Sequence, residues 1–190
     1  MGNYDDIGIP VQGQPVSSGA FGIKVRNYLI NADSRLSAIE GSQGVIARGQ
    51  RITNSSTTSG TTELGVLRVD NIPVYAGRLY RISTGPIIID GSVANDAVRA
   101  VLRGDTTGVA TTASPQMAIA QTVVPNISLP ETLEIDVPYA PAADGTLSVL
   151  LSIVRQSGTG VFQALGASTI PINLVVSGEG IDPGDTGVDL

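Results

Sequence analysis

From Val45 onward the sequence is a series of short segments in which apolar and polar residues alternate, separated by turn residues. Alternation with a period of two puts successive side chains on opposite faces of a β-strand, so that one face can be buried. The segments are residues 45–53, 64–69, 73–75, 79–83, 87–89, 97–103, 117–124, 133–137, 146–155, 161–165 and 170–176. About eight to ten short strands at regular spacing are typical of a sandwich or small barrel. We therefore expect a mainly β fold, an antiparallel jelly-roll-like β-sandwich over residues 44–177.

Turn and strand-end residues punctuate this series. The polar stretch Asn54–Thr62 predicts a loop, and Asp70-Asn71 and Ala76-Gly77 predict turns. The most apolar segment, Thr146–Arg155, predicts a central strand. Four prolines fall at expected strand ends, where a missing N–H does least harm: Pro125, Pro130, Pro138 and Pro141.

The segment from Phe21 to Glu40 predicts the one long helix of the chain, within a short oligomerising unit over residues 21–43. Apolar residues recur at spacings of four and three, which is a heptad seam. Its members are Val25, Leu29, Ala32, Leu36 and Ile39, with Arg35 at g and Glu40 at the following e. Leu at a with Ile or Val at d favours three or four strands over two, so we expect a homo-oligomer, with a trimer favoured. The alternative is an amphipathic helix lying on its own β-domain, and fewer than three heptads do not decide between them.

The two ends of the chain are predicted to lack a core of their own, one as an extended arm and the other as a flexible tail. Residues 1–20 hold several Gly and Pro and too few large apolar groups for a core, so we expect an extended docking arm. Its alternating contacts with a partner are Tyr4, Ile7, Ile9 and Val11, and a disordered leader is the alternative. Residues 178–190 predict an acidic flexible tail. Its carboxylates, Glu179, Asp182, Asp185 and Asp189, match no EF-hand spacing.

The composition excludes several classes of function. The chain has no His and no Cys, so it cannot hold a His/Cys metal site, a Ser-His-Asp triad or a cysteine nucleophile. A net charge of −6 disfavours nucleic-acid binding, which needs a basic face. No apolar run approaches the roughly 18 residues of a membrane-spanning helix, and the N-terminus lacks the features of a secretory signal. We expect no cofactor, no metal and no membrane insertion.

Two groups of residues offer chemistry. Glu131, Glu134 and Asp136 lie close in sequence, with Glu134 and Asp136 on one strand face, and a glycosidase needs two carboxylates in a cleft. The chain has five Tyr, two Phe and no Trp, which are few for a sugar-binding cleft. We therefore interpret these carboxylates as charges on a solvent-exposed strand face. Residues 103–105 have the sequence Arg-Gly-Asp, which is the integrin-binding tripeptide. Gly-Asp is also common where a strand ends and a turn begins, and we expect that structural role here.

Two stretches resemble structural proteins of tailed-bacteriophage particles. The opening, IGIPVQGQPVSSGAFGIKVRNYLINADSRLSAIE, is similar to the virion-docking leader and short helix of fibre or minor structural components. VDNIPVYAGRLYRIS, Val69–Ser83, is similar to a phrase common in the β-domains of such proteins. The resemblance covers about a quarter of the chain and carries no catalytic signature. It implies a trimer or other homo-oligomer displayed on the head or tail, and no cofactor.

Together these features predict a non-enzymatic virion protein, assembled in the host cytoplasm. Its arm anchors on the major capsid protein or another virion protein, and its β-sandwich points outwards as a capsid decoration or head fibre. The alternative is a tail-tip fibre that binds a receptor or a host surface glycan, which predicts an exposed aromatic or carboxylate cluster at the loop end far from residue 1. A carboxylate-dependent glycan hydrolase is the third hypothesis.

Overall fold

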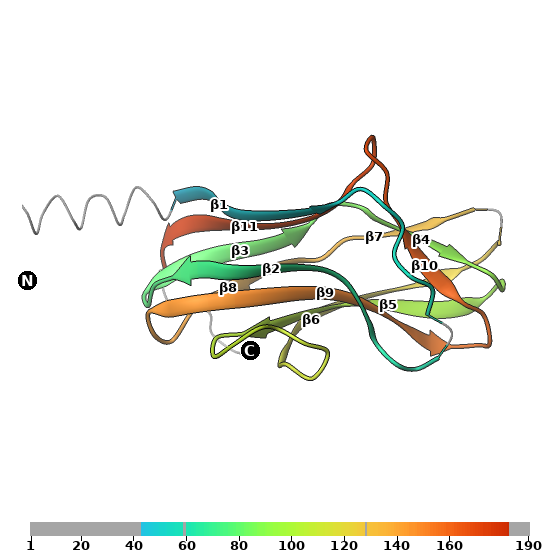
Figure 1. Cartoon of the computed structure of the whole chain (residues 1–190), viewed down its shortest axis with the longest axis horizontal. Coiled ribbons are helices and arrows are strands. Elements are labelled where there is room, and N and C mark those ends of the chain that lie inside the picture. The colour runs from blue at the N-terminus through green and yellow to red at the C-terminus, as the bar shows by residue number, and fades with distance from the viewer. Residues whose placement is uncertain (1–42, 59, 128, 183–190) are drawn as a thin grey trace, which may run out of the picture. The chain divides into compact units, whose positions relative to one another are not determined.

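The computed structural model describes residues 43–58, 60–127 and 129–182. The chain divides into two units, Met1–Gly41 and Ser42–Leu190, and only the second contains described residues. The expected arm and helix therefore lie outside the described residues. Within the described ranges the protein is all β, with eleven strands and no helix (Figure 1).

The first layer of the sandwich is built from two short sheets that continue one another. One has the order β1-β11-β3-β8 and the other the order β10-β4-β7. Their strands are β1 (Gln43–Arg51), β3 (Arg78–Thr84), β4 (Ile87–Gly91), β7 (Glu131–Leu133), β8 (Asp136–Tyr139), β10 (Phe162–Leu165) and β11 (Ile172–Ile181). Only Gly85 and Pro86 separate β3 from β4, and Thr84 N–H donates to the Ile135 carbonyl (2.8 Å) at the junction. The ladder therefore runs on from one sheet into the other.

The second layer is a single antiparallel sheet with the order β2-β9-β5-β6. Its strands are β2 (Leu64–Val74), β5 (Asp96–Asp105), β6 (Gln116–Val124) and β9 (Gly145–Ser157). With β3–β4, β7–β8 and β10–β11 taken as composite strands, eight strands form two four-stranded layers. This order, in which β5 and β6 are the only neighbouring strands that are consecutive in the described sequence, is that of a jelly roll. The predicted fold class is confirmed.

The core lies between the two layers because each strand turns its apolar side chains inward. On β9, Leu147, Val149, Leu151 and Ile153 are buried, and they face Ile82 and other apolar residues of the first layer. Full burial of one such side chain contributes about 1.5–3 kcal/mol. The largest fully buried side chains include Tyr80, Phe162, Ile72, Leu102, Ile172 and Leu174. β9 lies between β2 and β5, which is the central position predicted for it.

Local differences from the sequence prediction have physical causes. Asp70 and Asn71 do not end a strand, because Asn71 takes a left-handed backbone (φ 57°) in a bulge and β2 continues to Val74. The segment predicted as one strand over 133–137 is divided between β7 and β8. β11 runs to Ile181, past the predicted end of the β-domain at residue 177, because Gly180 and Ile181 still pair with β3.

Candidate interaction surfaces

The residues predicted for assembly lie in the part of the chain that precedes the described residues. This holds for the docking residues Tyr4, Ile7, Ile9 and Val11 and for the seam from Val25 to Glu40. Their roles stay predictions. The surfaces that the structure does describe are the two ends of the sandwich and its outer faces.

One end, here called the arm-proximal end, holds the place where the chain enters β1 and leaves β11. Gln43 and Glu179 are directly paired there. The β2–β3 turn, the β5–β6 connection and the β8–β9 loop also lie at this end, and a hydrogen bond joins the β2–β3 turn to the β8–β9 loop. Ala76 N–H donates to Asp144 Oδ1 (2.8 Å), and Asp182 N–H donates to the Gly77 carbonyl (3.0 Å). The connections at this end therefore hold one another in place.

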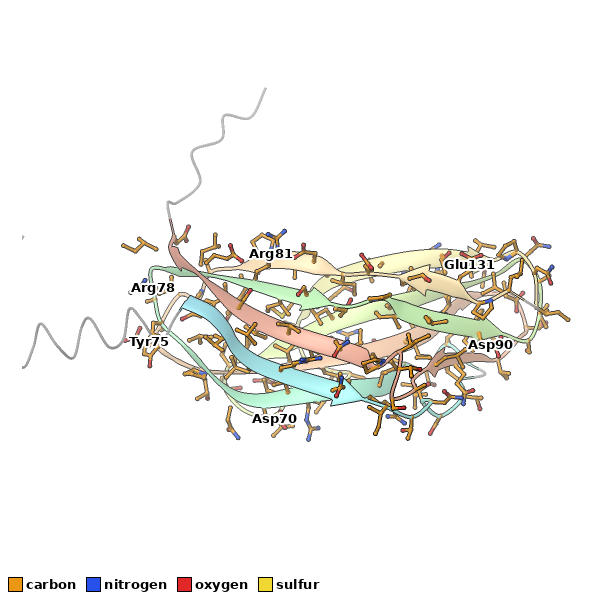
Figure 2. All side chains as sticks on the ribbon, turned by 90° about the horizontal axis from the view of Figure 1, so that it is seen from above. Asp70, Tyr75, Arg78, Arg81, Asp90 and Glu131 are labelled. Carbon is orange, nitrogen blue, oxygen red and sulfur yellow. The ribbon has the colours of Figure 1, made fainter. Side chains whose placement is uncertain are left out.

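The tyrosines of the β-domain gather at the same end. Tyr80 and Tyr139 are cross-strand partners on β3 and β8, and the buried Tyr80 hydroxyl accepts from Tyr75 N–H (2.9 Å). Burial raises the pKa of Tyr80. Tyr75 itself is exposed, and Figure 2 shows it beside Arg78 at the end opposite Asp90 and Glu131. The three tyrosines of the described residues thus lie at the end where the chain enters β1.

The opposite end, here called the distal end, is made of four connections that contain no charged residue. These are residues 52–62, 92–95, 125–130 and 158–161, which consist of hydroxyl, amide, small and aliphatic residues. Four aliphatic side chains are exposed to solvent there: Ile52 (54%), Val93 (37%), Ile127 (56%) and Leu129 (60%). None of the described residues in these connections is aromatic. The aromatic or carboxylate cluster expected of a glycan-binding tip is therefore not found among them.

A buried carboxylate holds part of the distal end in shape. Asp96 is 5% exposed at the start of β5, and its Oδ2 accepts from Thr159 N–H (2.8 Å) and from Gly160 N–H. Gly158 has a φ of +89°, and a Cβ there would lie 1.8 Å from Asp96 Oδ1. The β9–β10 turn thus requires glycine, and the carboxylate is used in structure rather than offered to a ligand.

Two of the three carboxylates considered for hydrolysis, Glu134 and Asp136, lie on the outer face of the first layer, whereas Glu131 pairs with buried Ile89 and shares the face of buried Leu133 on β7. Leu133 and Ile135 are buried whereas Glu134 and Asp136 are exposed, so these two side chains share the outer face as predicted. Asp136 forms a bidentate pair with Arg81, at 2.7 Å for both contacts. Hydrogen bonding from Arg81 holds the pKa of Asp136 below its ordinary value. A lowered pKa does not suit a general acid, and the exposed bidentate pair with Arg81 occupies the carboxylate that a nucleophile or base would need free, so this geometry does not support the hydrolase hypothesis.

The Arg-Gly-Asp residues are part of a hydrogen-bonded network on the second layer. Arg103 donates from Nε and Nη2 to the Glu63 carboxylate (2.7 and 2.6 Å) and from Nη1 to the Ser114 carbonyl (2.8 Å). Asp105 accepts from Thr107 N–H (2.8 Å), which lowers the pKa of its carboxyl. Both charged groups are therefore committed to partners within the chain, as the turn interpretation predicts.

The remaining acidic residues form no metal centre in the part of the chain that the structure describes. Glu179 lies in β11, and Asp182 follows the strand, while Asp185 and Asp189 lie outside the described residues. No group of three or more carboxylates that could hold a metal ion is found among residues 43–182 as described. No described helix is long and apolar enough to cross a membrane.

The sequence matches no protein-family model and no curated protein. Solved structures with a related arrangement include a CBM22 xylan-binding domain from Paenibacillus barcinonensis, with 7% identity, a TM-score of 0.36, and coverage of 74% of this chain and 99% of that one. A CBM4 structure has 9% identity, a TM-score of 0.33, and coverage of 70% and 94%. The VP2 subviral particle of infectious bursal disease virus has 9% identity, a TM-score of 0.33, and coverage of 72% and 35%. At such scores these similarities bear no weight, and the fold is assigned from the strand order.

Proposed function

We propose that this chain is a non-enzymatic structural component of a bacteriophage particle, anchored through residues 1–20 and displaying its jelly roll outwards. Residues 21–43 associate as a short parallel bundle through the seam from Val25 to Ile39. The partner of the arm is the major capsid protein or another virion protein. The proposal starts from the phage-like stretches of the sequence.

The observation that carries the display geometry is the placement of the chain ends. The arm joins the sandwich at Gln43, and the chain leaves β11 beside it, so both appended segments start from the arm-proximal end. The distal end then remains accessible when the arm is docked. A jelly roll used in this way needs no catalytic site. Fold alone does not assign function, so the assignment depends on testing the arm.

Truncation tests the anchoring step. A chain lacking residues 1–20 should fail to bind particles that lack this protein, while its β-type circular dichroism spectrum stays unchanged. Burial of the apolar arm residues provides the affinity, at roughly 25 cal/mol per Å² before ordering costs. The matched control is a chain lacking residues 183–190, which should still bind. Binding by the arm-deleted chain at the level of the full chain would overturn the proposal.

The bundle is tested by solution mass. Leu29→Asp/Leu36→Asp puts charge at both a positions of the seam and should reduce the mass measured by light scattering. Gln12→Asp/Gln14→Asp adds the same charge in the arm and should leave the mass unchanged. An unchanged mass for the seam variant would show that the helix does not associate through this face.

A second candidate function is receptor contact through the distal end, and one observation favours it. The distal connections are uncharged and expose Ile52, Val93, Ile127 and Leu129, and depletion of charged residues is one feature of protein interface cores. This chemistry suits an apolar protein surface better than a sugar. Ile127→Ser/Leu129→Ser should lower binding to host cells without changing particle association. Unchanged cell binding would remove this candidate.

A further inference from the structure

Strand β6 is an edge strand that lacks the usual features that prevent edge-to-edge pairing. It ends the order β2-β9-β5-β6 and pairs only with β5 in the described structure (Figure 1). Its nine residues, QMAIAQTVV, include no charge and no proline. Two aliphatic side chains on its outer face are exposed, Ile119 at 48% and Val123 at 45%. A long, uncharged and apolar edge is a template for another strand.

The other long edges of the sandwich are protected. β1 carries Arg48 and Arg51 and is interrupted by a bulge between Val45 and Ala47. β2 carries Arg68 and Asp70, and its register shifts at two places. The edge strand β8 has four residues, one of which is a proline. Charges, bulges, short length and proline are the devices that block an added strand, and of these β6 has only one register shift near its start, between Gln116 and Ala118, which leaves Ala118–Val124 in regular pairing.

We propose that β6 pairs in antiparallel fashion with β6 of a second copy of this chain, about a two-fold axis at Gln121. Antiparallel pairing of identical strands is self-complementary, so each contact occurs twice. With the axis at Gln121, Ile119 of each copy lies opposite Val123 of the other, on one face of the ladder. Both exposed aliphatic side chains are then covered by an apolar partner.

The polar groups near the axis are compatible with this pairing. Arg99 on β5 donates from Nε to Gln121 Oε1 (2.8 Å), which fixes the amide at the centre of the strand. The amide nitrogen can donate across the axis, because an amide oxygen accepts two hydrogen bonds. The two Arg99 residues would be three strand spacings apart, about 14 Å. That separation exceeds the Debye length of about 8 Å at physiological salt, so their repulsion is screened.

This contact is independent of the seam and of the proposed virion role. A two-fold contact cannot operate within a three-chain bundle, so it would connect subunits of different bundles. It joins two second layers into one continuous sheet of eight strands, four from each copy. The occupant is therefore a second copy, and a strand of another protein is the competing outcome.

Cysteine cross-linking tests the axis directly, since the chain has no Cys of its own. Directly opposed residues have Cα atoms about 4.5–5.5 Å apart, which a disulfide can bridge. The full chain with Gln121→Cys should form covalent dimers under mild oxidation about tenfold or more faster than Gln50→Cys, whose cysteine is exposed on edge strand β1. Equal rates for the two variants would overturn the proposal.

A charge exchange tests the register and the identity of the occupant. Ile119→Lys/Val123→Lys places like charges opposite one another, and Ile119→Glu/Val123→Glu does the same with the opposite sign. Each variant alone, carrying Gln121→Cys, should cross-link at the rate of the Gln50→Cys control. A mixture of the two should regain the fast rate, because Lys then faces Glu. Failure of the mixture to recover, with both variants folded by circular dichroism, would show that β6 does not pair with itself.

Discussion

The pair formed by Glu63 and Arg103 is the clearest place to test whether the Arg-Gly-Asp residues serve structure. The side chains are 12% and 19% exposed, and two parallel contacts of 2.7 and 2.6 Å join the guanidinium to the carboxylate. Ser152, which is fully buried, also donates its hydroxyl proton to Glu63 Oε1. Removal of either charge leaves the other without its main partner.

The expected cost follows from burial and geometry. Breaking a fully buried ion pair by removing one partner costs about 3–5 kcal/mol, and the residual exposure here reduces that value. Arg103→Met leaves the carboxylate with Ser152 alone and should lower the free energy of unfolding by about 2–3 kcal/mol. Glu63→Gln keeps an acceptor for the guanidinium and should cost about 1–2 kcal/mol. The double variant should cost about 1–2 kcal/mol less than the sum.

The pH dependence of the same variants gives an independent readout. Burial raises the pKa of Glu63, but hydrogen bonds from Arg103 and Ser152 and the Arg103 charge outweigh it, so that the net pKa is lowered. A lowered folded-state pKa stabilises the protein above the unfolded value of roughly 4.3, and this contribution is lost as pH falls through the folded value. The difference in stability between wild type and Glu63→Gln should therefore narrow below about pH 4.

Urea unfolding followed by circular dichroism measures all four proteins on the full chain. Asp136→Asn is the matched control, since it removes an exposed carboxylate that also pairs with arginine. Additive costs for the two single variants would refute the coupling that the geometry requires. Costs no larger than that of Asp136→Asn would show that the tripeptide is not held by this network.

Three further predictions concern other contacts. Ser148→Ala removes the acceptor of the buried Ala110 N–H (2.8 Å) and a donor to Asp70. It should lower the free energy of unfolding, measured with urea, by about 1–3 kcal/mol, whereas Ser168→Ala at an exposed position should leave it unchanged. Gly158→Ala should lower the melting temperature because a Cβ meets the fixed Asp96 carboxylate, while Gly108→Ala, with open space around it, should not; equal melting temperatures would contradict the clamp. Arg81→Gln removes an exposed pair with Asp136 and should leave the urea midpoint nearly unchanged, so a large shift would mean that the pair matters more than its exposure allows.

Strands such as β4 and β11 were predictable because their burial follows a period of two that a single segment displays, whereas β9 was predictable from a continuous apolar run that is buried on both faces. Thr146–Arg155 reads as a buried strand without knowledge of its neighbours, and it forms the centre of β9. Local signals failed where the backbone bends without ending a strand. Asp70-Asn71 has the composition of a turn, and the left-handed φ of Asn71 satisfies that preference within a bulge while pairing with β9 continues.

The interaction surfaces were less predictable because they depend on register between distant segments. Arg103 meets Glu63 from 40 residues away, and Tyr80 meets Tyr139 only through the pairing of β3 with β8. The absence of charge on β6 was visible in its sequence, but its position at a sheet edge required the strand order. Each distal loop could be recognised in the sequence by its turn residues. That the four loops lie at the same end of the sandwich follows only from the topology.

The uncharged edge strand β6 is followed directly in sequence by an uncharged connection of the distal end. Variants on either side of Val124 can therefore separate the roles of these two surfaces. β6 ends at Val124, and Ile127 and Leu129 follow in the β6–β7 connection at the distal end. One continuous apolar interface would require both sets of side chains for the same contact. Self-pairing centred on Gln121 instead uses Ile119 and Val123 and leaves the distal loops free for another partner. Ile127→Ser/Leu129→Ser should therefore leave the cross-linking rate of Gln121→Cys unchanged, and a loss of that rate would merge the two surfaces into a single interface between copies.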